Sequence, residues 1–153
     1  MIVLSETEEI KIESDVKPIP IVRTPFYLFD EKKNKDIKSK PYYNTNNVNF
    51  FINYDGEEYT IFINKGYTWD GASIPIGFRW LIGPKGCPAF LLASMVHDYI
   101  CECKWLVDYD RYLSSLILYQ LLLACDVPEW KAKLMRLGVE LYQKHNKEWK
   151  NVR

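Results

Sequence analysis

The chain has 153 residues, which is long enough for one domain with a hydrophobic core and too short for two ordinary domains. We therefore expect a single domain over residues 1–153. Apolar residues make up 48% of the sequence and aromatic residues 15%, which excludes a disordered chain. Lys and Arg together number 20, as do Asp and Glu, so the chain has no net charge that would favour nucleic acid or an anionic membrane.

From the sequence we expect neither export through a signal peptide nor a membrane span. It turns acidic soon after the apolar residues Met1–Leu4 and lacks the basic start of a signal peptide. We expect the cysteines to be free thiols in a reducing cytosol. The most apolar run, residues 113–125, is shorter than the roughly 20 residues that a membrane span needs, so we predict a buried helix there.

We expect residues 1–46 to form an extended arm with loops. Three prolines within residues 16–29 predict short edge strands, because proline donates no hydrogen bond to a neighbouring strand. Residues 30–40 are almost wholly polar and predict an exposed loop. Residues 48–54 and 58–64 flank Asp55-Gly56, a pair typical of a tight type I′ turn, and predict a β-hairpin central to a sheet.

The second half of the chain is helical. After an irregular Gly- and Pro-rich connector, Pro88 opens a helix that we expect to end near Cys103. A second helix is expected over residues 108–124, with Asp108 as its N-cap, and Pro128 opens a third that reaches about residue 150. Strands followed by helices indicate an α+β fold, with an N-terminal antiparallel sheet packed against a C-terminal three-helix unit.

The third helix carries an amphipathic stripe, because Trp130, Leu134, Leu137 and Leu141 recur at spacings of four, three and four. Its other face carries five basic residues: Lys131, Lys133, Arg136, Lys144 and Lys147. We interpret that basic face as solvated, since acidic residues elsewhere balance it, and we expect no nucleic-acid partner.

The candidate site combines a histidine with carboxylates. His97 follows a run of apolar residues in the first helix, so it is expected to point to the core, as a base, a metal ligand or a structural bridge. Asp98 lies about 100° away around the helix and could straddle the same pocket or lie on the flank. Asp110 is expected near the end of the first helix, within reach of His97 or Cys101, because the connecting loop is short.

Asp70 and Ser73 belong to the sequence Trp-Asp-Gly-Ala-Ser-Ile-Pro at residues 69–75. Gly71 makes this segment a turn by composition, in which both side chains can cap backbone N–H groups. Ser73 lacks the glycines of a hydrolase nucleophile elbow, and there is no phosphate-binding loop. The cysteines and histidines do not have the spacing of a zinc finger. A divalent cation held by Asp70, Asp110 and His97 is chemically reasonable, so the sequence leaves undecided whether a metal binds.

These motifs resemble the DUF1353 family of phage and prophage proteins. The resemblance runs from about Gly66 to Leu141 and depends on residues 69–75, on Val-His-Asp-Tyr at 96–99 and on Asp-Arg at 110–111. The family's usual residues are replaced here by Trp69 for a threonine, Cys101 for a tyrosine and Tyr109 for an alanine. The positions retained are Asp70, Ser73, His97, Asp98 and Asp110.

Two functional hypotheses remain open from the sequence. The resemblance implies a phage-encoded protein, and the first hypothesis is a virion-associated or assembly component whose His/Asp cluster joins the sheet to the helices. Its partners would be other virion proteins, in the host cytoplasm during infection or in the virion. The second hypothesis is a small hydrolase that uses His97 with Asp70 and Asp110 for acid–base or metal-dependent chemistry.

Overall fold

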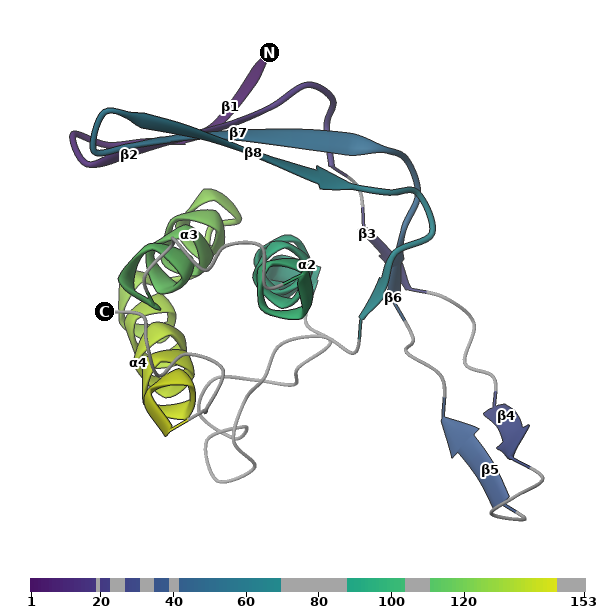
Figure 1. Cartoon of the computed structure of the whole chain (residues 1–153). Coiled ribbons are helices and arrows are strands. Elements are labelled where there is room, and N and C mark those ends of the chain that lie inside the picture. Colours follow the sequence, from purple (N-terminus) through teal and green to yellow (C-terminus); the bar gives the residue numbers. More distant parts are fainter. Residues whose placement is uncertain are drawn as a thin grey trace.

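The computed structural model describes residues 1–18, 20–22, 27–30, 35–38, 42–69, 88–103 and 111–145. An antiparallel sheet lies on one side of the described part, and the three helices lie together against one face of that sheet (Figure 1). The α+β fold expected from the order of strands and helices is confirmed.

The main sheet has four strands in the order β1-β2-β7-β8: β1 (Ile2–Glu6), β2 (Ile10–Ser14), β7 (Val48–Tyr54) and β8 (Glu57–Ile63). The N-terminal residues, expected to form an extended arm, instead supply half of this sheet. Ile12 pairs with Ile52 across the β2–β7 ladder. Ile10 and Ile12 are fully buried, because alternate residues of a strand point to the same face.

The β7–β8 hairpin confirms the turn predicted from Asp55-Gly56. Asp55 has φ 52° and Gly56 has φ 75°, the left-handed conformations that a type I′ turn requires. The position of the hairpin differs from the expectation, since β7 is an inner strand but β8 is an edge of the sheet. The hairpin therefore lies at one side of the sheet, and the N-terminal strands take the other.

Two smaller sheets complete the strand half. One contains β3 (Pro20–Val22), β6 (Tyr42–Asn44) and β9 (Thr68–Trp69) in the order β3-β6-β9, and the other pairs β4 (Tyr27–Asp30) with β5 (Lys35–Lys38). The short strands expected among the prolines are confirmed. The expectation of a loop over residues 30–40 is wrong at β5, whose polar residues pair in register with β4.

The helices are α2 (Pro88–Cys103), α3 (Arg111–Ala124) and α4 (Glu129–His145). Helix α2 has the predicted limits, and α3 ends where expected, whereas the proposed cap Asp108 lies outside the described residues. Helix α4 follows Pro128, whose carbonyl accepts a hydrogen bond from the Ala132 N–H at 3.0 Å. Among the described residues, no helix is long and apolar enough to cross a membrane.

The core lies between the inner face of the main sheet and the helices. Helix α3 is its centre, as predicted for a buried helix, and it packs against both α2 and α4. Helix α4 turns a different face inward from the one that its apolar stripe suggests. Ala132, Met135 and Val139 are buried, whereas Trp130 and Leu137 are each 50% exposed. Leu141 is 52% exposed and belongs to the same outer stripe.

Candidate functional site

Trp69 anchors the candidate site. It ends β9, pairs with Tyr42 of β6 and is fully buried. Its indole Nε1 donates a hydrogen bond of 3.0 Å to Ser94 Oγ in α2. The Ser94 hydroxyl in turn donates to the Leu91 carbonyl at 3.1 Å. This pair satisfies the buried indole N–H and joins the strand half to the first helix.

Aromatic rings surround Trp69. The Tyr67 ring is stacked on it with a centroid separation of 6.1 Å, and the Tyr42 ring lies tilted at 5.9 Å. Tyr99, from α2, meets Tyr67 edge to face at 5.3 Å. Ring pairs in these arrangements stabilise a core beyond the area that they bury. Trp69, the first residue of the motif, is therefore packed against α2.

His97 lies one turn after Ser94 in α2 and is only 7% exposed, as predicted from its apolar neighbours. Burial lowers the pKa of His97 to about 4, because desolvation disfavours the charged imidazolium. The Cys101 Sγ atom lies 3.8 Å from Nδ1 and 3.9 Å from Nε2. The ring is therefore neutral at pH 7 and able to donate one hydrogen bond and accept another. We group the Trp69–Ser94 pair with the buried His97, which lies one helical turn further along α2, and call these residues the Trp69 cluster.

This environment decides what His97 can do chemically. A general base works best with a pKa near the operating pH, and a pKa of about 4 makes His97 a weak base at pH 7. A neutral imidazole can bind a metal. Among the described residues, however, no three His, Cys, Asp or Glu side chains are grouped to hold one. The described geometry favours a structural bridge.

Of the other residues of the predicted site, only some belong to the part of the chain that the structure describes. Asp98 is half-buried in α2, so whether it borders the same pocket as His97 stays a prediction. Asp70, Ser73 and Asp110 lie outside the described residues, so their approach to His97 stays a prediction. Cys101 and Cys125 are free thiols, as expected. Sequence reasoning missed Trp69 and Ser94 as partners, although an isolated serine in an apolar helix is a signal for a buried hydrogen bond.

A second polar cluster joins α3 to α4. Arg136 Nε donates to Ser115 Oγ at 3.2 Å, and Ser115 Oγ donates to Glu140 Oε1 at 2.8 Å. The Arg136 guanidinium also lies over the rings of Tyr112 and Tyr119, at 4.9 and 5.6 Å. Arg136 was expected on a solvated face, but its side chain is only 19% exposed.

Tyr112 extends this second cluster to the sheet. Its hydroxyl donates to Glu9 Oε1 at 2.6 Å, in the turn between β1 and β2. That hydrogen bond raises the pKa of Tyr112, because the nearby carboxylate stabilises the protonated phenol. We call Glu9, Tyr112, Ser115, Arg136 and Glu140 the Arg136 cluster.

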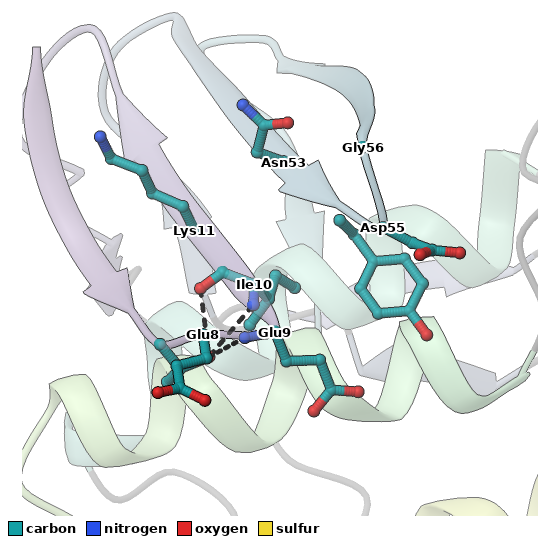
Figure 2. Close-up of a pocket in the computed structure, with 9 residues that line it drawn as sticks. Glu8, Glu9, Ile10, Lys11, Asn53, Asp55 and Gly56 are labelled. Carbon is teal, nitrogen blue, oxygen red and sulfur yellow. Dashed lines mark hydrogen bonds between the residues drawn. The ribbon is translucent and has the colours of Figure 1, made fainter.

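The turns β1–β2 and β7–β8 lie side by side and form a shallow acidic depression (Figure 2). Glu8, Glu9 and Asp55 contribute carboxylates around it. Local hydrogen bonds account for the shape of the first turn, since Thr7 Oγ1 accepts from the N–H groups of Glu9 and Ile10 at 3.2 and 3.1 Å. We assign no ligand to this depression.

Comparison with known proteins adds a family and one curated relative. A family described as "Protein of unknown function (DUF1353)" matches residues 47–139, from just before β7 to within α4. The chain is 40% identical over 80 residues to "Uncharacterized protein y4jT" of Sinorhizobium fredii (strain NBRC 101917 / NGR234). Those residues are 52% of this chain and 23% of that relative, so the chain spans under a quarter of the relative's length. No solved structure matches.

Proposed function

Because the chain belongs to the DUF1353 family of proteins of unknown function, we propose its role from the geometry of the site: it is a structural protein, a phage-encoded component of the virion or of its assembly. The observation that carries this proposal is the burial of His97 as a neutral side chain of α2. A residue that is hidden from solvent in this way supports packing better than it supports turnover of a substrate.

The surface of the protein also supports a role in contacts with other chains. Several large apolar side chains are exposed on α4, and Val3 and Phe62 are exposed on the main sheet. Exposed apolar groups that gather on one element are typical of protein interfaces. In this proposal the partners are other virion proteins, and the chain acts in the host cytoplasm during infection or within the particle.

The alternative role, a hydrolase with His97, Asp70 and Asp110, would need a solvent-open pocket that contains His97. The near-complete burial of His97 gives no support for such a pocket in the described part of the chain. The metal-dependent form of this alternative stays a prediction, since Asp70 and Asp110 lie outside the described residues.

The test is made in a lysogen that encodes the chain. After induction, particles are separated on a density gradient, and the untagged protein is followed by mass spectrometry. We expect it to co-sediment with particles, or its deletion to lower the yield of complete particles. Normal particle yield from the deletion strain, together with absence of the protein from particles, would contradict the proposal. His97→Gln should leave the particle phenotype intact if the variant folds, because no catalysis is required.

A further inference from the structure

Helix α4 carries two apolar stripes, of which the fold uses only one. The inner stripe, Ala132, Met135 and Val139, is buried against the rest of the domain. The outer stripe consists of Trp130, Leu134, Leu137 and Leu141. Leu134 is half-buried, and the other three are about half exposed. A helix at the surface of a globular protein normally has one apolar face, so the second stripe calls for a partner.

The spacing of the outer stripe indicates what kind of partner fits. Separations of four, three and four residues are those of the a and d positions of a coiled coil, which pack against another helix. The stripe covers three turns, or about 17 Å of helix. The spacings four, three and four are the same when the helix is followed in the opposite direction, so the stripe can pair with an antiparallel copy of itself. An antiparallel second copy of α4 would place Trp130 beside Leu141 of the second copy, and Leu134 beside Leu137 of the second copy.

We propose that two copies of this chain form a twofold-symmetric dimer through antiparallel α4 helices, with the outer stripe as the seam. This inference does not depend on the proposed phage function. In such a dimer each seam residue meets another seam residue, so both copies use the same patch, as a twofold interface requires. The seam lies on the opposite side of α4 from the buried inner stripe, and Leu137 borders the groove between α3 and α4.

The charges beside the seam fit this antiparallel arrangement. Lys133 and Glu140 lie on the same side of the stripe, seven residues apart, at positions that flank a coiled-coil seam. In the antiparallel dimer Lys133 lies opposite Glu140 of the second copy, and symmetry repeats the pair. Lys133 is available for this contact, because its side chain is 65% exposed and its pairing with Glu129 is a surface pair. A parallel dimer would instead bring Lys133 beside Gly138 of the second copy and leave it without a charged partner.

The other flank of the seam is open at Gly138. A Cβ atom added there would meet no heavy atom within 4 Å, so packing within the chain does not explain a glycine inside a helix. The missing side chain leaves room for Lys131 of the second copy, which the antiparallel arrangement places opposite. On the first flank, a shallow groove between α3 and α4 continues the apolar surface from Leu137 to Tyr112 and Tyr119.

The first experiment measures the mass of the protein by sedimentation over about 1 to 200 µM, the range in which an interface of this small size dissociates. We expect a monomer–dimer equilibrium. Leu137→Asp should weaken dimerisation at least tenfold, because it places a charge in the seam. Phe62→Asp is the matched control, since Phe62 is 41% exposed on the main sheet, and it should leave the equilibrium unchanged. A monomer at every concentration, or a dimer that tolerates Leu137→Asp, would overturn the proposal.

A charge exchange tests the antiparallel arrangement directly. Lys133→Glu alone and Glu140→Lys alone should each weaken self-association, because each variant brings like charges together across the seam. Mixing the two variants should restore a dimer, now a heterodimer with both ion pairs intact. Circular dichroism melts check that Glu140→Lys folds, because Glu140 also accepts from Ser115. Failure of the folded variants to associate on mixing would overturn this arrangement. Neither result depends on the particle experiment, so the two proposals fail independently.

Discussion

The Trp69 cluster and the Arg136 cluster both join separate elements of this fold, but they do so with different chemistry. The Trp69 cluster is buried and neutral, since its indole, hydroxyl and imidazole carry no charge at pH 7. The Arg136 cluster is partly exposed and ionic. Burying a charge costs several kcal/mol, whereas water screens charges near the surface. The free energy of unfolding should therefore change strongly when the buried Trp69 cluster is mutated or the pH is lowered. It should change only weakly when the Arg136 cluster is mutated.

The largest effect is expected when Trp69 is shortened. Trp69→Ala removes a fully buried ring and should lower the free energy of unfolding by about 3 to 5 kcal/mol. Ser94→Ala is the matched control, because it keeps the ring but strands the indole N–H, at a cost of about 1 to 3 kcal/mol. Denaturant melts with fitted slopes measure both variants. A loss below about 1 kcal/mol for Trp69→Ala would show that this cluster is not the main contact that holds the strand half to α2.

His97 should make stability depend on pH. The pKa of His97 is about 4 in the folded protein and near 6.5 in the unfolded chain, so the unfolded state binds more protons between these values. Stability is therefore complete above pH 6.5 and falls as the pH drops. The loss between pH 6.5 and 5 should be about 1 to 2 kcal/mol, before most carboxylates titrate. His97→Gln should flatten this part of the curve, and an unchanged slope would place the imidazole in solvent.

A smaller effect is expected at Arg136. Arg136→Met keeps an unbranched but shorter side chain and leaves Ser115 and Glu140 without their cationic partner, at a cost of about 1 kcal/mol. Raising the salt concentration should reduce the difference between the variant and the native protein. Lys133→Met is the control, because that lysine belongs to an exposed pair and should change stability less. Equal losses for the two variants would show that burial of Arg136 has no energetic effect.

The smallest effect is expected at the link between α3 and the first turn. Tyr112→Phe removes the hydrogen bond to Glu9 and should cost about 0.5 kcal/mol, because both groups can bind water instead. The measurement is a thermal melt at pH 7, with Glu9→Gln as the matched change on the other side. If either variant lowered the stability as much as Trp69→Ala does, the expected difference between the Trp69 cluster and the Arg136 cluster would be wrong.

The parts of the fold that were predictable depend on local chemistry. Asp55-Gly56 fixed the β7–β8 turn, because few residues adopt positive φ at both positions of a type I′ turn. Pro88 marked the start of α2 for an equally local reason. The role of β2 was not predictable, since Ile10-Lys11-Ile12-Glu13 is too short a pattern to show that its partner is β7, some 40 residues later.

The candidate site was predictable in part for the same reason. The burial of His97 could be inferred from the apolar residues that precede it in α2. The hydrogen bond from Trp69 to Ser94 joins residues 25 positions apart, and no periodicity within one element reveals such a contact. The α4 stripe shows the same limit, because periodicity shows that a helix has an apolar face but not which neighbour covers it.

The place of β2 in the main sheet has a consequence for synthesis of the chain. Ile10 and Ile12 leave the ribosome some 40 residues ahead of β7, their hydrogen-bonding partner. The 40 residues from Ser14 to Tyr54 take ~2 to 8 s to add at typical elongation rates. For that time the apolar face of the β1–β2 pair has no sheet to join. A nascent chain in which β2 has left the ribosome but β7 has not should therefore be a better substrate for chaperones than one in which both strands have left it.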